Sequence, residues 1–325
     1  MAYLTRTEFN ENRKRCMQNI NHMVKMLNME DHIKDIEKYI ATYDETESIT
    51  ADIIKKYTGN SSLVTQPIPK ISLNLAPQAS GKSMLNTYSV KKLHANCVVI
   101  NSDELKKFYP RAYEISNSKF SPLYSYITDI GSNLFTSVLL KYCLEAGYNV
   151  IFEGTGKSLR ILDTIRPYKN KYRIKIRTIG VSAMTSLSSI LVRYMGQKQK
   201  DDCARLVRAV DFISSYQNIV TLCDVAESEG YIVEVFARAN TESKLPIKLY
   251  SSHQRKGYEN AVQAIYYARK HNNEMCFEKN LELLEEVKNF LIKNKESNVL
   301  AEALDIFYHI IIVDKLVDYD DAEGF

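Results

Sequence analysis

The 325-residue sequence has no apolar run approaching the roughly 18 residues that a membrane-spanning helix needs. Its first residues lack the charged and then apolar layout of a signal peptide. The six cysteines are scattered singly, without a Cys-x-x-Cys pair or a His/Cys cluster that would predict a metal site. The net charge of +4 is too small by itself to indicate nucleic acid. We therefore expect a cytoplasmic protein with reduced thiols and no membrane contact.

The pattern of apolar residues divides the chain into three parts. Residues 1–66 predict helices near 7–27, near 33–40, and from Thr50 as an N-cap to Gly59. This part is predicted to be either a helical cap on the next part or a regulatory segment. Residues 67–255 alternate short apolar strands with helices, and residues 256–325 predict an appendage of three helices.

The central part predicts an α/β fold with a doubly wound parallel sheet and flanking helices. Ligands of such sheets lie at the carboxyl ends of the strands, so the polar residues that follow the strands are the candidates for a site. The predicted strands cover residues 71–75, 97–100, 148–152, 175–181 and 231–237.

A candidate phosphate-binding loop follows the first predicted strand. Gly81-Lys82-Ser83 opens a helical pattern, which places backbone N–H groups and a helix N-terminus around a phosphate. Lys82 would reach the β- and γ-phosphates, and Ser83 would bind Mg²⁺. Ala76 stands where the motif has its first glycine, which requires a negative φ there. The alternative is a turn that only joins a strand to a helix. The predicted nucleotide-binding residues are Pro77, Gln78, Ala79, Ser80, Gly81, Lys82 and Ser83.

Carboxylates follow two further strands. Asp103 could accept a proton from a substrate hydroxyl, or it could cap the next helix. Glu153-Gly-Thr-Gly156 places a carboxylate and the hydroxyl of Thr155 near a ligand, or forms a strand-to-helix turn.

Arginines lie on either side of a short polar hinge at residues 196–202. Arg193 and Arg205 could form a lid whose guanidinium groups stabilise charge on a transferred phosphoryl group, with Arg208 as the alternative to Arg205. Taken singly, an arginine in such a segment is more often a surface residue than a catalyst.

With these segments in order, the chain resembles the zeta toxin family of P-loop kinases. The resemblance covers about residues 70–255 and is carried by the phosphate loop, by the strand ends at Asp103 and Glu153, by Val192-Arg-Tyr194 with Ala204-Arg205, and by Lys248-Leu-Tyr-Ser-Ser252. It implies a P-loop NTPase-like fold and a toxin that uses ATP and Mg²⁺ to phosphorylate a UDP-amino sugar such as UDP-N-acetylglucosamine. It also implies that Asp103 is the base, that Lys82, Arg193 and Arg205 bind the phosphates, and that Glu153 and Thr155 lie beside the sugar nucleotide.

The acceptor side agrees less closely with the family. Asn133 and Thr136 match its pattern, but counting back from Gly147 places Ser137 where the family has a substrate-binding Glu. The alternatives are a P-loop kinase for another acceptor, such as a nucleotide, a dinucleotide or a nucleic-acid end, or a nucleotide-binding interaction protein without turnover. The family also implies an antitoxin partner. From their size and helicity alone, we hypothesise that the N-terminal helices act as such an inhibitor in cis.

Overall fold

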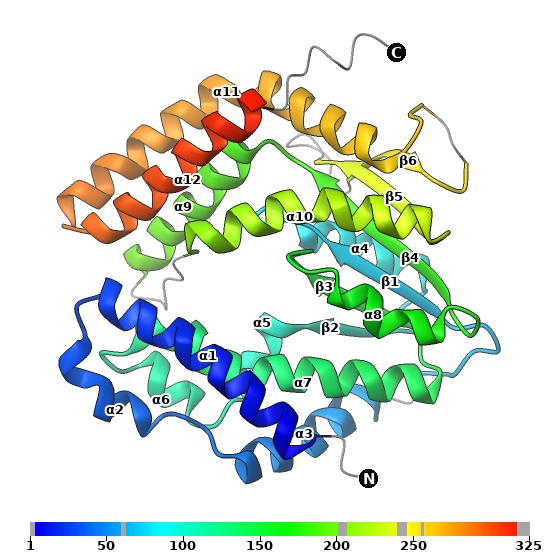
Figure 1. The fold of residues 1–325 in the computed structure, drawn as a ribbon, viewed down its shortest axis with the longest axis horizontal. Helices are drawn as coiled ribbons and strands as arrows, with labels where there is room; N and C mark the ends of the chain where they lie inside the picture. The colour runs from blue at the N-terminus through cyan, green and yellow to red at the C-terminus, as the bar shows by residue number, and fades with distance from the viewer. Residues whose placement is uncertain (1–3, 60–62, 201–206, 239–245, 255–256, 317–325) are drawn as a thin grey trace.

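The computed structural model describes residues 4–59, 63–200, 207–238, 246–254 and 257–316 (Figure 1). A six-stranded sheet has the order β2-β3-β1-β4-β5-β6; β6 runs antiparallel to β5, and the other neighbours are parallel. The predicted α/β class is therefore confirmed. The strands are β1 (Lys70–Leu75), β2 (Val98–Asn101), β3 (Val150–Gly154), β4 (Arg173–Gly180), β5 (Ile232–Ala237) and β6 (Ile247–Ser251).

Helices surround the sheet on both faces. The helices before β3 are α1 (Arg6–Met26), α2 (Ile33–Glu37), α3 (Tyr43–Thr58), α4 (Lys82–Lys92), α5 (Ser102–Leu105), α6 (Ala112–Ser116) and α7 (Tyr124–Ala146). Those after β3 are α8 (Arg160–Ile165), α9 (Ala183–Gln199), α10 (Ala209–Ser228), α11 (Ala261–Lys293) and α12 (Ser297–Leu316). Single 3-10 turns lie at Glu30–His32, Lys106–Phe108, Ser121–Leu123 and Arg166–Tyr168. Among the described helices, none is long and apolar enough to cross a membrane.

The two faces of the sheet differ in chemistry. One face buries aliphatic side chains such as Leu73, Ile176 and Val233 against α7, α8, α10 and the start of α11. The other face carries Ser72, Asn74 and further polar residues, and α4 crosses it over β3, β1 and β4. Successive residues of a strand point to opposite faces, so one set of strands builds both an apolar core and a polar layer.

Two of the N-terminal helices, α1 and α3, pack on α7 (Figure 1). Phe9, Cys16, Ile20 and Met23 are buried on α1, as their helical spacing predicts, and they join a second core with α7, α9, α10, α11 and α12. The amide of Asn12 donates to the buried carbonyl of Ile130 on α7 at 2.7 Å. This helix is therefore part of the core around the sheet domain, and the predicted division into three parts stays a prediction.

Three expectations need correction. The third helix begins earlier than predicted, at Tyr43, because Thr42 and Glu45 form a capping box, and the hydroxyl of Thr50 instead donates to the Thr46 carbonyl within the helix. The first two predicted C-terminal helices are the single helix α11, since no Pro or Gly interrupts the segment. The strand β6 was not predicted.

One glycine allows a close helix contact. A Cβ at Gly180, the last residue of β4, would lie 2.5 Å from the Cβ of Ala268 and 3.0 Å from the carbonyl oxygen of Ile265. Both neighbours belong to α11, so the absent side chain lets α11 approach the sheet directly.

Candidate active site

The phosphate loop joins the end of β1 to the start of α4. Ala79 and Gly81 have positive φ of 56° and 98°, which curls the loop ahead of the helix N-terminus. Ala76 is not among the residues with positive φ, and its buried N–H donates to the Gly154 carbonyl at 3.2 Å. Ala76 therefore avoids the positive φ that an alanine at the first position of the loop could not easily adopt.

Side chains within the loop hold its shape. The ammonium of Lys82 donates to the carbonyls of Ala76 at 3.0 Å and Pro77 at 2.7 Å. The buried hydroxyl of Ser80 also donates to the Pro77 carbonyl, at 2.8 Å. Gln78 accepts from Ser215 on α10 at 2.5 Å, which ties the loop to that helix. Ser83 is exposed in the first turn of α4.

Asp103 lies on α5 directly after β2. The side chain of Asn101 caps this helix by accepting from the Asp103 N–H at 2.9 Å, so capping does not occupy the Asp103 carboxylate. That carboxylate pairs with Lys106 at 3.1 Å and is 58% exposed toward the cavity. Lys106 is buried and also pairs with Asp129 of α7 at 2.9 Å, which fixes its position from a second helix.

Glu153 lies near the end of β3, between β2 and β1, in register with Asn101 of β2. Its carboxylate accepts from the amides of Asn86 on α4 and, at 3.0 Å, of Asn101. Burial raises the pKa of Glu153, and nearby Lys82 acts in the opposite direction. Asp103 and Glu104 raise this pKa further through like-charge repulsion, which places the strand-end carboxylates within one electrostatic environment.

These groups line one cavity of about 460 Å³ at the carboxyl ends of β1, β3 and β2. Lys82, Asp103 and Glu153 line it, together with three of the predicted substrate-binding residues, Thr155, Asn133 and Thr136. Ser137, at the position where the family has a glutamate, also lines it and is exposed. The hydroxyl of Thr136 donates to the Ser132 carbonyl at 2.7 Å, and Asn133 donates to Asn12 at 3.4 Å.

The three arginines lie differently. Arg193 is exposed on α9 and is not among the described residues that line the cavity or its neighbour. Arg205 lies outside the described residues. Arg208 lines an adjoining cavity of about 450 Å³, where it pairs with Asp211 at 2.6 Å and donates to Asn19 at 3.0 Å.

Sequence reasoning missed several residues of the site. Arg15 and Asn19 reach it from α1, and Lys106, Lys157 and Arg160 add positive charge. No local motif marks these residues. The helical spacing of α1 predicts its buried face, but not the surface that this face packs against.

A family model described as zeta toxin matches residues 54–245, which is more than half of the chain. The chain belongs to the zeta toxin family. The predicted resemblance is therefore confirmed.

Two curated relatives of this zeta toxin family chain are both called Toxin zeta. The protein from Streptococcus agalactiae is 25% identical over 178 residues, and the protein from Enterococcus hirae is 24% identical over 176 residues. Each alignment covers 53% of this chain and 60% of the relative, so the chain spans about three fifths of the length of these relatives.

Solved structures share the fold. A structure from a study of the PezAT chromosomal toxin-antitoxin system of Streptococcus pneumoniae has a TM-score of 0.61 at 17% identity, over 77% of this chain and 98% of that one. A crystal structure of AvrRxo1-ORF1:-ORF2 with ATP has a TM-score of 0.50 at 11% identity, over 69% of this chain and 72% of that one. At these identities the two matches bear on the fold alone.

Proposed function

We propose that this chain transfers the γ-phosphate of ATP to a hydroxyl group of a small molecule. The observation that carries the proposal is one cavity lined by both Lys82 of the phosphate loop and the strand-end carboxylate of Asp103. Phosphoryl transfer depends mainly on positioning and on neutralising charge, with a residue that orients and deprotonates the acceptor. Membership of the zeta toxin family supports the same reaction.

The donor side uses the phosphate loop. Backbone N–H groups of residues 78–81 and of the first turn of α4 bind the phosphates, since a curled loop before a helix N-terminus favours anions. Lys82 leaves its contacts with the Ala76 and Pro77 carbonyls to bind the β- and γ-phosphates. Arg208, the predicted alternative to Arg205, stabilises charge on the transferred group, and its place in the lining of the adjoining cavity supports this role. Arg193, which lines neither cavity, and Arg205 stay predictions for the same role.

A magnesium ion fits the donor chemistry of the site. The exposed hydroxyl of Ser83 and the carboxylate of Glu153 are hard oxygen donors of the kind that Mg²⁺ prefers. Among the described residues no cluster of three or more His, Cys, Asp or Glu side chains forms a metal site by itself, which suits an ion held largely by nucleotide phosphates. The ion would neutralise charge on the phosphates.

The acceptor side lies across the cavity. Asp103 takes the proton of the acceptor hydroxyl, and Lys106 holds its carboxylate in place. Glu153, Thr155, Asn133 and Thr136 supply polar contacts to the acceptor. We propose a UDP-amino sugar such as UDP-N-acetylglucosamine as the acceptor, on the strength of the family.

A second candidate acceptor class is supported by one residue. Ser137 lines the cavity at the position where the family has a carboxylate. A missing buried hydrogen-bond partner costs about 1–3 kcal/mol of binding, so another hydroxyl-bearing nucleotide or dinucleotide is the alternative acceptor.

The test incubates the purified full-length chain with ATP, Mg²⁺ and UDP-N-acetylglucosamine and follows phosphorylated product by mass spectrometry. We expect product from the unmodified chain and a loss of about 10²–10⁴-fold in rate for Asp103→Asn, which keeps the shape of the side chain but not its basicity. Glu104→Gln, on the neighbouring exposed residue, is the control and should retain activity. Full activity of Asp103→Asn would exclude it as the base. A metabolite extract in place of the UDP-sugar distinguishes a different acceptor from a chain without turnover.

We also propose that the chain acts as a toxin with an antitoxin partner. Family membership supports the toxic activity, and one of the matched structures comes from a study of a toxin-antitoxin system.

Inhibition in cis by α1 is the narrower form of this proposal, and it rests on Arg15 and Asn19 of α1 lining the site. Because α1 also carries part of the core, a single substitution at Asn19 tests inhibition more cleanly than a deletion of α1. Higher phosphorylation by Asn19→Ala than by the unmodified chain would support inhibition.

A further inference from the structure

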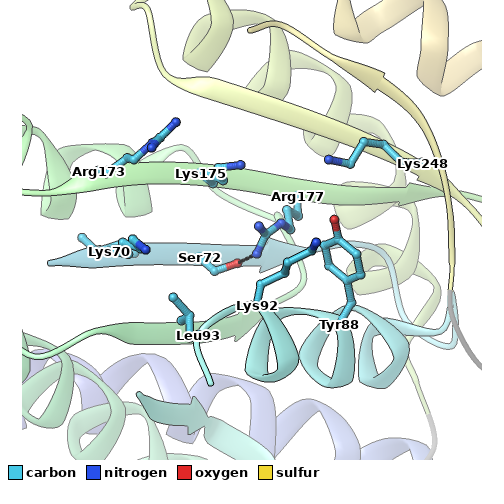
Figure 2. A pocket seen from close by; sticks show the side chains of 10 residues that line it. Lys70, Ser72, Tyr88, Lys92, Leu93, Arg173, Lys175, Arg177 and Lys248 are labelled. Carbon is cyan, nitrogen blue, oxygen red and sulfur yellow. Dashed lines mark hydrogen bonds between the residues drawn. The ribbon is translucent and has the colours of Figure 1, made fainter. Parts of the chain in front are cut away.

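A further cavity lies on the polar face of the sheet, beside the C-terminal half of α4 (Figure 2). Its volume is about 280 Å³. Six of its ten lining residues are Lys or Arg, and none is Asp or Glu. The cations are Lys70, Lys92, Arg173, Lys175, Arg177 and Lys248.

The cations gather because of strand geometry. Arg173, Lys175 and Arg177 alternate along β4, so all three point to the same face. Lys70 of β1 is the register partner of Arg173, and Lys248 comes from β6 on the far side of β5. In Figure 2, Lys92 rises from α4 toward this row of strand side chains. Four separate elements therefore supply positive charge to one small space.

One buried carboxylate forms ion pairs with three of these cations. Glu234 of β5 pairs with Arg177 at 2.7 Å, Lys175 at 3.0 Å and Lys248 at 2.8 Å. Glu234 and Arg177 are buried, whereas the side chains of Lys175 and Lys248 are 30% and 33% exposed and face the cavity. A buried ion pair normally balances its charges, because unpaired charge in a low-dielectric site is costly. Here the buried carboxylate leaves an excess of two positive charges.

The other three cations of the cavity add to this excess of positive charge. Within the described part of the chain, Lys70, Lys92 and Arg173 form no ion pair. With Glu234 included, the six cations leave a local charge of +5, which exceeds the +4 of the whole sequence. Positive charge is thus concentrated at this cavity while the rest of the chain is close to neutral, and a concave, single-sign surface attracts counter-ions.

We propose that this cavity binds a small anion that carries two or more linked phosphate groups. Several phosphates match the number of cations and their spread over four elements, and guanidinium and ammonium groups are the side chains that bind phosphate. The anion would lie between two pairs of cations, with Lys70 and Arg173 on one side and Lys92 and Lys248 on the other. Glu234 would lie beneath it.

The site is separate from the phosphate loop. The loop meets the N-terminus of α4, whereas Lys92 is the last residue of that 11-residue helix. At 1.5 Å per residue the two ends are roughly 15 Å apart. None of the cavity's lining residues lines the candidate active site.

The test is a calorimetric titration of the full-length chain with inorganic tripolyphosphate. The chain carries Lys82→Ala, so that binding at the phosphate loop is suppressed. In this background, Lys70→Gln with Arg173→Gln should weaken binding by about tenfold or more, since two charge-assisted contacts are lost. The matched control is Lys14→Gln with Lys91→Gln, which removes the same charge from exposed positions outside the cavity and should change affinity by no more than about twofold. Equal weakening by both pairs, or no binding at all, would overturn the proposal.

A second measurement avoids substitutions. Acetylation of lysines in the unmodified chain, read by mass spectrometry, should slow at Lys70, Lys175 and Lys248 when tripolyphosphate is added, and stay unchanged at Lys91. Unchanged labelling at all four positions would overturn the proposal. ATP titrated into the Lys82→Ala chain, with and without the Lys70→Gln and Arg173→Gln pair, identifies the source of the phosphates. Equal affinity for ATP and tripolyphosphate assigns recognition to the phosphate chain alone. Tighter binding of ATP that this pair abolishes adds a nucleoside to the occupant.

Discussion

Replacing Glu234 by Gln should lower the stability of the fold in a pH-dependent way. Three cations surround this buried carboxylate and, although burial opposes them, lower its pKa from 4.5 to about 2. One pH unit corresponds to about 1.4 kcal/mol, so the ionised carboxylate contributes about 3 kcal/mol to the free energy of unfolding at pH 7. Because the pKa is lower in the folded state, this contribution is complete above pH 4.5 and is lost as the pH falls toward 2.

Urea unfolding at a series of pH values measures this difference. We expect Glu234→Gln to be less stable than the unmodified chain by about 3 kcal/mol at pH 7 and by about 1.4 kcal/mol at pH 3. Glu259→Gln, at an exposed carboxylate, is the control and should differ from the unmodified chain by less than about 0.5 kcal/mol. A difference for Glu234→Gln that is the same at pH 3 and pH 7 would refute the reasoning, since the loss would then not come from charge.

Three further substitutions test other parts of the structure. Gly180→Ala should destabilise the chain by about 1–3 kcal/mol in thermal unfolding, because the new Cβ meets α11, and Ala268→Gly in the same chain should restore part of the loss. Thr42→Ala should cost about 1 kcal/mol in urea unfolding through loss of the capping box of α3; no loss would contradict that cap. Arg15→Ala should lower kcat/KM for phosphoryl transfer by about tenfold if Arg15 contacts an anionic substrate, whereas Arg13→Ala, exposed on the same helix, should not.

The phosphate loop and the strand-end carboxylates were predictable because their signals are local. The motif Gly81-Lys82-Ser83 predicts a phosphate-binding loop, and Asp103 and Glu153 each follow a predicted strand. Parallel strands bring their carboxyl ends to one edge, so these residues had to meet once the sheet was assigned. The structure places Lys82, Asp103 and Glu153 on one cavity, as that reasoning requires.

The position of Arg15, the strand β6 and the basic cavity depend on long-range packing, which local sequence patterns do not predict. Arg15 faces the site only because α1 packs on α7, and a helical pattern does not name its partner. The strand β6 is only five residues long, so its sequence pattern is weak, and pairing with β5 stabilises it. The basic cavity requires the register of β1 and β4 and the position of α4, none of which the sequence states.

The polar layer beneath α4 has a consequence for the phosphate loop. Asn74 donates to Asn86 at 2.8 Å and to Ser89 at 3.1 Å, and Arg177 donates to Ser72 and, at 2.8 Å, to Ser89. Apolar side chains tolerate small rotations of a helix, whereas hydrogen bonds weaken steeply with angle. The helix that presents the loop is therefore fixed both in rotation about its axis and in position along it. Substitutions at Asn74 and Ser89 should consequently be strongly non-additive, because the first one already releases the helix.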